Sequence, residues 1–285
     1  MNKESRELAT YKLFKTSKKF SLKWSSYFQV YEKIFSKYRK KKIKFVEIGV
    51  ANGGSLLMWK KFFGKNAEII GIDLNPDTKK MEKYGFKIYI GSQIDPVFWK
   101  DFFKKEGKID LILDDGGHKN LQQISTVHYC LPHIKDGGKI IIEDTVTNYL
   151  KKEFNNPSKY SFINFCNLII EMIHRRSGLL HKKLNIYSRK IYSINFFESI
   201  VVFSINSKKC FKSKEIYSKA KKEWEVDYRH HDYFTETKKL INKKYNFLNK
   251  INIIRKLLRK LFYRSALINF YEKQKIKKLF KYIKN

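Results

Sequence analysis

The stretch KFVEIGVANGGSLLMWKKFF, residues 44–63, contains the change of local structure on which the predicted fold depends. It begins with a short apolar run typical of a buried strand and ends with SLLMWKKFF, which is typical of a helix. Gly49 and Gly53 lie between the two, where glycine lets the backbone turn sharply and approach a ligand closely. The start of the helix adds free N–H groups. We expect a strand, a tight turn and a helix that can bind a ligand; an ordinary tight turn is the alternative.

The same alternation of strand and helix continues to about residue 205. Four further apolar runs predict strands, two segments between them predict helices, and KIYSINFFESIVVFSI contains two strand-like runs with little between them. Such alternation is typical of an α/β fold in which helices cover both faces of a parallel sheet. We therefore expect a mostly parallel, seven-stranded, Rossmann-like sheet that ends in an antiparallel hairpin. The four runs are AEIIGIDL, KIYIGS, IDLILDD and GGKIIIED, and the two helical segments are PVFWKDFFKKEG and LQQISTVHYCLPHI.

Three parts of the chain differ in character. Residues 1–43 form an N-terminal helical region, in which WSSYFQVYEKIFSKY has apolar residues at the spacing of one helix face. Residues 44–206 form the α/β domain. Residues 207–285 form a basic, mostly helical extension, and within it residues 246–263 predict a basic amphipathic helix. That helix can lie on an anionic membrane or pack against protein.

The composition limits the class of protein. The chain has 285 residues, is 42% hydrophobic and has a formal net charge of +34, which favours an acidic partner such as nucleic acid, anionic lipid or an anionic substrate. A lysine-rich composition of the kind that AT-rich genomes give is the alternative source of that charge. The three cysteines are scattered, and no run reaches the roughly 18 apolar residues of a membrane span. We therefore expect a cytoplasmic protein, with peripheral contact to the inner face of the membrane through the extension.

Polar residues at three strand ends predict a cofactor site. Glu47, Gly49 and Gly53 follow or end the first strand in the pattern Glu-x-Gly-x-x-x-Gly, and Asp73 ends the next strand. An acidic side chain there can accept hydrogen bonds from both hydroxyls of a ribose. Gln93 follows the third strand, where it can meet an adenine edge or be an ordinary polar loop residue. Because the spacing departs from the dinucleotide G-x-G-x-x-G, the pattern favours S-adenosylmethionine over NAD.

Two neighbouring strands end in acidic pairs, which predicts a metal site. IDLILDD ends with Asp114 and Asp115, and KIIIEDT contains Glu143 and Asp144. Since the carboxyl ends of parallel strands meet at one edge of the sheet, three carboxylates there would repel each other unless a cation neutralises them. Oxygen ligands suit Mg²⁺, with Ca²⁺ or Mn²⁺ as alternatives. His118 would remain free as a base; helix capping by the aspartates and a solvated histidine are the structural alternative.

Taken together, these motifs resemble the metal-dependent class I S-adenosylmethionine sugar O-methyltransferases, including the mycinamicin and rhamnosyl types and the related cephalosporin-hydroxylase-like bacterial proteins. The resemblance implies that Asp115, Glu143 and Asp144 are metal ligands and that His118 is the general base. It also implies that Glu47, Gly49, Asp73 and Gln93 lie in the cofactor site, to which the sequence pattern adds Gly53. The resemblance spans residues 23–204 and is carried by KWSSYFQVYEKIF, VEIGVANGGSLLMWKKFFG, IIGIDLNP, GSQIDP, DLILDDGGH, IIIEDTVTNY and IYSINFFESIVV.

The function that follows is methylation of a sugar hydroxyl, in which a cation lowers the hydroxyl pKa and His118 takes its proton. We expect a sugar or glycan acceptor, lipid- or nucleotide-linked, in bacterial surface-polysaccharide biosynthesis. We also expect that the chain can form an oligomer. One alternative is a nucleic-acid methyltransferase, which the net charge of +34 supports. The other is a catalytically inactive scaffold at a membrane.

Overall fold

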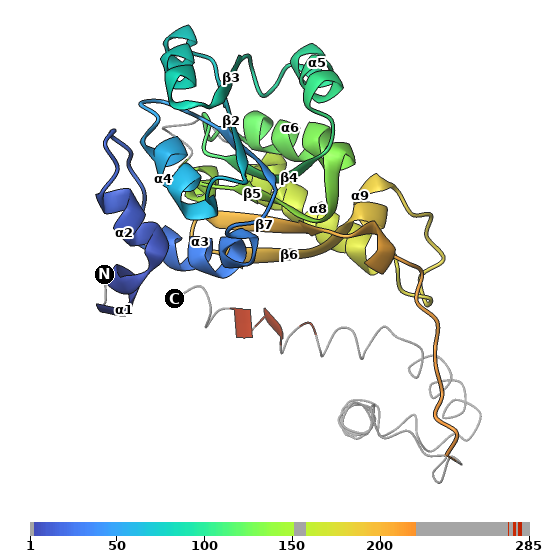
Figure 1. The fold of residues 1–285 in the computed structure, drawn as a ribbon. Coiled ribbons are helices and arrows are strands. Elements are labelled where there is room, and N and C mark those ends of the chain that lie inside the picture. Colours follow the sequence, from blue (N-terminus) through green and yellow to red (C-terminus); the bar gives the residue numbers. More distant parts are fainter. Residues whose placement is uncertain (1–2, 151–157, 221–272, 274–275, 278, 281–285) are drawn as a thin grey trace, which may run out of the picture. The chain divides into compact units, whose positions relative to one another are not determined.

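The computed structural model describes residues 3–150, 158–220, 273, 276, 277, 279 and 280, and Figure 1 draws the others as a thin trace. The chain divides into two compact units, Met1–Ile216 and Tyr217–Asn285. The elements of the first unit include seven strands: β1 (Lys44–Ile48), β2 (Glu68–Asp73), β3 (Lys87–Ile90), β4 (Ile109–Asp114), β5 (Ile134–Ile142), β6 (Ile191–Phe197) and β7 (Ile200–Ile205). Its α-helices are α1 (Lys3–Glu7), α2 (Ala9–Lys15), α3 (Tyr27–Phe35), α4 (Gly54–Phe63), α5 (Pro96–Glu106), α6 (Asn120–Cys130), α8 (Phe162–His174) and α9 (Ile186–Lys190). Short 3₁₀ helices η2 (Pro76–Tyr84) and η4 (Thr145–Tyr149) follow β2 and β5.

The seven strands form one sheet in the order β3-β2-β1-β4-β5-β7-β6. The strands from β3 to β5 are parallel neighbours, whereas β7 pairs antiparallel with both β5 and β6. The order reverses between β1 and β4, the position where open α/β sheets bind ligands. The predicted mostly parallel sheet with a C-terminal antiparallel hairpin is therefore confirmed.

Helices cover both faces of this sheet, as Figure 1 shows, and each face has its own apolar core. On one face, α3 and α4 pack against alternate strand residues such as Phe45, Leu111 and Leu113. On the other face, α5, α6 and α8 pack against the intervening residues, such as Val46 and Ile112. Because the inner strands β1, β2, β4 and β7 are buried on both faces, their sequences are largely continuous apolar runs, whereas the edge strands β3 and β6 are partly exposed.

The N-terminal region packs onto the sheet domain through α3. The predicted apolar face of this helix is buried, and it includes Tyr27, Phe28, Tyr31, Ile34 and Phe35. Ahead of it, residues 17–24 run without helix or strand across the turn that precedes α4. The Ser17 hydroxyl donates to the Gly54 carbonyl at 2.9 Å, and a side chain at Gly54 would collide with the carbonyl oxygens of Lys19 and Phe20. The N-terminal segment is thus held close to the glycine turn.

The C-terminal extension is described only in part. Residues 207–220 contain one 3₁₀ turn, Ser207–Lys209, and are otherwise not helical, and the mostly helical character of residues 207–285 stays a prediction. Five positions near the C-terminus are helical: 273, 276, 277, 279 and 280. The amphipathic helix predicted at 246–263 lies outside the described residues, and the domain boundaries at 43/44 and 206/207 stay predictions. Among the described helices, none is both long and apolar enough to cross a membrane.

Candidate active site

The register of the sheet brings the predicted residues to one edge. Ile48 of β1 pairs with Asp114 of β4, which in turn pairs with Ile142 of β5. The residues that follow these three strands therefore leave the sheet at the same level. Gly49 follows β1, Asp115 follows β4, and Glu143 and Asp144 follow β5.

Gly49 and Gly53 make the turn after β1, as predicted. Both have positive φ, 91° and 78°, which glycine adopts without steric cost. A Cβ at Gly49 would lie 2.1 Å from the carbonyl oxygen of Asp115, so only glycine lets the two strand ends approach this closely. The glycine turn at Gly49 and the loop that begins at Asp115 are thus in direct contact.

Asp73 ends β2 beside this turn. Its Oδ2 accepts hydrogen bonds from the backbone N–H groups of Val50 and Ala51, at 2.8 and 3.0 Å, and its Oδ1 accepts one from Asn75 N–H at 2.9 Å. The carboxylate is partly exposed. Asp73 thus fixes the glycine turn, and its predicted contact with a ribose stays a prediction.

Glu47 is fully buried under the same turn. Its two oxygens accept hydrogen bonds from Ser55 Oγ at 2.9 Å and Trp59 Nε1 at 3.0 Å, both on α4. Burial raises the pKa of Glu47 to about 7, although the nearby charge of Lys23 opposes the rise. The observed contacts of Glu47 hold α4 to β1.

Gln93 points toward the acidic loop. Its Nε2 donates to Asp114 Oδ2 at 2.8 Å and to Thr126 Oγ1 at 3.0 Å, and the side chain is buried. Asp114 in turn accepts a hydrogen bond from Gly116 N–H at 3.1 Å, which fixes the start of the loop. These contacts give Gln93 a structural role at β4, and its predicted contact with adenine stays a prediction.

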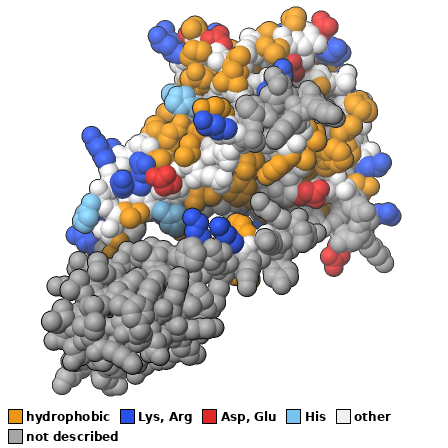
Figure 2. Space-filling view, turned by 180° about the vertical axis from the view of Figure 1, so that it is seen from behind, with side chains coloured by type: hydrophobic (Ala, Val, Ile, Leu, Met, Phe, Trp, Pro, Cys, Tyr) orange, Lys and Arg blue, Asp and Glu red, His pale blue; other side chains and the backbone are white. Residues whose placement is uncertain are grey.

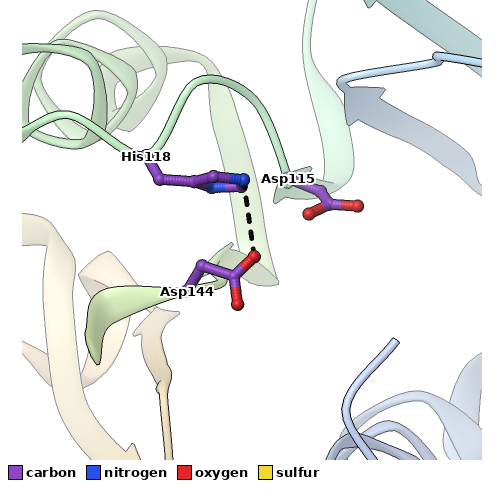
Figure 3. A group of neighbouring side chains, drawn as sticks. All are labelled: Asp115, His118 and Asp144. Carbon is purple, nitrogen blue, oxygen red and sulfur yellow. Dashed lines mark ion pairs between the residues drawn. The ribbon is translucent and has the colours of Figure 1, made fainter. Parts of the chain in front are cut away.

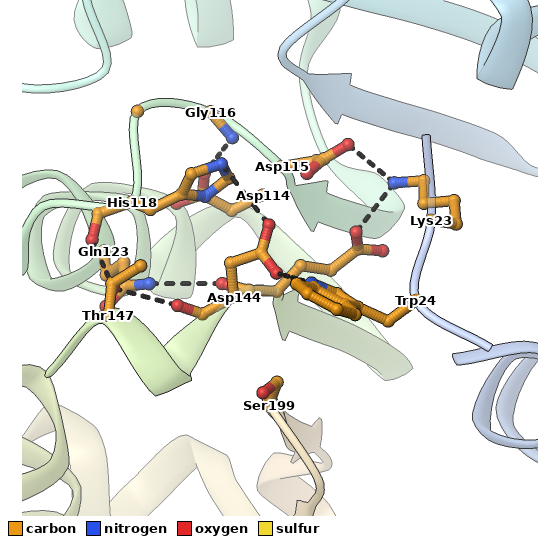
Figure 4. A network of polar contacts seen from close by, with 12 residues as sticks. Lys23, Trp24, Asp114, Asp115, Gly116, His118, Gln123, Asp144, Thr147 and Ser199 are labelled. Carbon is orange, nitrogen blue, oxygen red and sulfur yellow. Dashed lines mark hydrogen bonds and ion pairs between the residues drawn. The ribbon is translucent and has the colours of Figure 1, made fainter. Parts of the chain in front are cut away.

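Asp115 and Glu143 share a partner that sequence analysis missed. Lys23 Nζ lies 2.6 Å from Asp115 Oδ2 and 2.7 Å from Glu143 Oε2, and the lysine side chain is only 1% exposed. Figure 4 shows Lys23 reaching toward Asp115 from the N-terminal segment. Tyr31 donates its hydroxyl to the second oxygen of Glu143, Oε1, at 2.5 Å. Both oxygens of the buried Glu143 thus have partners from the N-terminal region.

The charges of this group depend on one another. Burial alone would lower the pKa of Lys23, but the negative charges of Asp115, Glu143 and Glu47 outweigh it and hold that pKa above its usual value. Burial raises the pKa of Glu143, and the positive charge of Lys23 opposes the rise. Lys23 therefore stays protonated and compensates the buried carboxylates.

Asp144 and His118 form the exposed side of the site. Asp144 Oδ1 accepts hydrogen bonds from Tyr27 OH at 2.6 Å and Trp24 Nε1 at 3.0 Å, and Asp144 Oδ2 lies 3.4 Å from His118 Nε2. His118 and Asp144 both have positive φ, 56° and 51°, which is uncommon for residues with a side chain. The Thr147 hydroxyl, which donates to the His118 carbonyl at 2.8 Å, ties the two loops together. Backbone strain of this kind concentrates at functional sites.

Three of these side chains can hold a metal ion. One ligand atom each from Asp115, His118 and Asp144 lies within 4.8 Å of the other two (Figure 3). Two carboxylates and an imidazole suit a divalent cation with a preference for oxygen and nitrogen. This set differs from the predicted one, because His118 joins the group while Glu143 faces Lys23 and Tyr31.

The structure thus brings together Asp115, His118, Glu143 and Asp144, while Glu47, Gly49, Gly53, Asp73 and Gln93 lie around the adjoining turn. It adds partners from the N-terminal region. The signal that could have found Lys23 was the charge argument itself, because a buried lysine neutralises carboxylates as a metal does. The added residues are Lys23, Trp24, Tyr27 and Tyr31.

Comparisons with known proteins agree with this architecture. Residues 46–145 match a methyltransferase domain family. The chain is 33% identical over 144 residues to demethylmacrocin O-methyltransferase of Streptomyces fradiae, a match that covers 47% of this chain and 36% of the relative. It is 27% identical over 164 residues to an 8-demethyl-8-alpha-L-rhamnosyl tetracenomycin-C 2'-O-methyltransferase of Streptomyces olivaceus, covering 53% of this chain and 43% of the relative. The chain thus spans less than half the length of these two relatives.

A solved structure has the same fold. The MycE methyltransferase of the mycinamycin biosynthetic pathway, in complex with Mg, SAH and mycinamycin VI, superposes with a TM-score of 0.61 at 25% identity. The match covers 71% of this chain and 54% of the other. Residues 46–145 carry a methyltransferase domain, and the chain is similar to the sugar O-methyltransferases that its motifs predicted.

Proposed function

We propose that the chain transfers a methyl group from S-adenosylmethionine to a hydroxyl of a sugar, assisted by a divalent cation. The observation that carries this proposal is the cluster of Asp115, His118 and Asp144 beside the glycine turn at Gly49. The turn and Asp73 would hold the methyl donor, and the cluster would hold the cation and the acceptor. Relatives named for a rhamnosyl substrate and a neighbour solved with Mg and SAH support the assignment.

The chemistry divides between these residues. A divalent cation held by Asp115 and Asp144 would lower the pKa of the acceptor hydroxyl. His118 Nε2 lies 3.4 Å from Asp144 Oδ2, and His118 would take the hydroxyl proton as a base that faces the cation without ligating it. The acceptor oxygen then attacks the methyl carbon in line, the sulfur–methyl bond breaks, and S-adenosylhomocysteine leaves. The second contribution of the site would be to hold the methyl donor and the acceptor hydroxyl next to each other.

An Asp115→Asn variant tests the role of the cluster. It keeps the shape of the side chain but removes a charge, so it should weaken Mg²⁺ binding and abolish methyl transfer, with partial rescue by excess Mg²⁺. The matched control is Asp110→Asn, at the opposite end of β4, where the carboxylate accepts hydrogen bonds from Lys44 N–H and Lys135. The control should transfer methyl groups as the wild type does. Full transfer by the wild type in excess EDTA would contradict the role of the metal.

Within this reaction class we propose a surface-polysaccharide sugar as the acceptor, which rests on the composition of the chain. Transfer to lipid- or nucleotide-linked sugars, compared with transfer to glycosylated antibiotics, distinguishes the acceptors.

For residues 246–263 we propose peripheral membrane contact, which flotation with anionic liposomes tests. The alternative function, methylation of nucleic acid, rests on the net charge of +34. On the face shown in Figure 2, the described lysines and arginines are scattered among other side chains and do not form one basic patch.

A further inference from the structure

Lys23 occupies the position between two carboxylates where a bridging cation would bind. Its Nζ lies 2.6 Å from Asp115 Oδ2 and 2.7 Å from Glu143 Oε2, and both acidic residues were predicted as metal ligands. The lysine side chain is 1% exposed, so water does not screen its charge. An ammonium group in such a place satisfies the same electrostatic need as a metal ion.

The neighbours of Lys23 bind two further carboxylate oxygens of the site, Asp144 Oδ1 and Glu143 Oε1. Trp24 and Tyr27 donate to Asp144, and Tyr31 donates to Glu143. Each predicted metal ligand is therefore contacted by residues 23–31, which lie outside the matched methyltransferase domain of residues 46–145. The positive charge in this set of contacts comes from Lys23, whereas the other three donors are neutral.

A divalent cation and an ammonium group cannot both bind these oxygens closely. Mg²⁺ requires oxygen ligands at about 2.1 Å, so an ion bound between Asp115 and Glu143 would take the place that the lysine nitrogen occupies. An ion bound instead by Asp115, His118 and Asp144 would still share Asp115 with the lysine, and two positive charges held by one carboxylate repel each other.

We propose that Lys23 is the internal cation of this site and competes with the divalent cation for Asp115 and Glu143. When no metal is bound, the ammonium compensates the buried carboxylates and keeps them in place. When a metal binds, it displaces the ammonium from at least one of them. Lys23 thereby sets the concentration of metal at which the site fills. The proposal rests on the proposed function only for the metal site and makes no use of the acceptor.

The test is titration of the full chain with Mn²⁺, a spectroscopic substitute for Mg²⁺, followed by electron paramagnetic resonance of the free ion. A Lys23→Met variant keeps the length of the side chain and removes its charge. It should bind Mn²⁺ about tenfold more tightly than the wild type, or better, because one nearby positive charge is lost. Lys135→Met is the matched control: it removes the same charge from Asp110, at the far end of β4, and should stay within about twofold of the wild type.

Thermal unfolding gives a second readout that does not depend on turnover. In EDTA, Lys23→Met should unfold at a lower temperature than the wild type, since its carboxylates have lost their cation, and Mg²⁺ should restore it far more than it raises the wild type.

Three outcomes would overturn the proposal: equal or weaker Mn²⁺ binding by Lys23→Met, no binding by either protein, or a variant that Mg²⁺ cannot stabilise. Titration of the wild type with S-adenosylmethionine is read separately. If that binding fails, the methyltransferase proposal fails, and the competition measured with Mn²⁺ stands.

Discussion

The two ends of the candidate site are held together in different ways. At the turn after β1, Asp73 is held by backbone N–H groups of Val50, Ala51 and Asn75, all within 23 residues of it. At the ends of β4 and β5, the carboxylates are held by side chains from the N-terminal region, 92 to 120 residues away in the sequence.

A carboxylate at a strand end can thus find its hydrogen-bond partners either close to it in the sequence or far from it. A tight glycine turn presents its own backbone donors, so a single carboxylate near it finds partners wherever the turn forms. Carboxylates that lie next to each other repel, and they need a positive charge from elsewhere in the chain to offset that repulsion. The Asp73 carboxylate is therefore expected to keep its partners when side chains of the N-terminal region change, whereas the carboxylates at the ends of β4 and β5 are expected to depend on those side chains.

The largest effect should come from the acidic end. Removing the imidazole in His118→Ala should lower the methyl-transfer rate by roughly 10²–10⁴, the usual contribution of a general base, while S-adenosylmethionine binding stays nearly intact. Residual activity should rise with pH, because hydroxide can replace the missing base. His181→Ala, at an exposed position, is the control. A variant whose loss of rate is matched by an equal loss of stability would show that His118 has a structural role.

A second effect concerns pH and the buried Glu47. A carboxyl whose pKa is higher in the folded chain holds its proton more tightly when folded, so its contribution to stability is greatest below about pH 4. Burial raises the pKa of Glu47 to about 7, and that contribution is lost as the pH rises toward this value.

Glu47→Gln cannot ionise. Relative to the wild type, its free energy of unfolding should therefore improve by on the order of 2–3 kcal/mol between about pH 4 and pH 8. Urea unfolding at both pH values measures this change. Parallel pH profiles of the two proteins would mean that Glu47 ionises in the folded chain as it does when unfolded.

At the cofactor end, Asp73→Ala should weaken S-adenosylmethionine binding by one to two orders of magnitude, about 1.4–3 kcal/mol. The variant loses the proposed ribose acceptor and also the oxygen that fixes the N–H groups of Val50 and Ala51. Asp77→Ala, an exposed carboxylate on the following 3₁₀ helix, is the control and should bind normally. Titration calorimetry decides, and unchanged affinity in Asp73→Ala would remove this residue from the site.

The smallest effect compares two tyrosines of the N-terminal region. Tyr31 donates to the buried Glu143 carboxylate, whereas Tyr38 donates to the neutral carbonyl of Gly137 at 2.6 Å. A buried charged acceptor loses more when its donor is removed, so Tyr31→Phe should cost about 1–3 kcal/mol and Tyr38→Phe about 0.5–1.5 kcal/mol. Denaturant unfolding measures both. Equal losses would indicate that the hydrogen bond to the Glu143 carboxylate stabilises the fold no more than the hydrogen bond to the Gly137 carbonyl does.

The fold was largely predictable because its signals are local. Continuous apolar runs, the turn at Gly49 and Gly53 and the spacing of the helices indicated the parallel sheet and the final hairpin, which the structure confirms. The meeting of the two acidic pairs at one edge was also predictable, since parallel strands end at the same level. The mostly helical character of residues 207–285 stays a prediction, since residues 207–220 contain one 3₁₀ turn while the five described positions near the C-terminus are helical.

By itself, the sequence determined which residue types lie at each strand end, and therefore that the site would combine a glycine turn with carboxylates and an imidazole. Only the tertiary structure decided how the carboxylates are neutralised. Lys23 lies 92 residues from Asp115 and 120 residues from Glu143, and no local pattern links them. The physical reason is that hydrophobic periodicity and turn chemistry act over a few residues, whereas the pairing of buried charges depends on which segments the fold brings together.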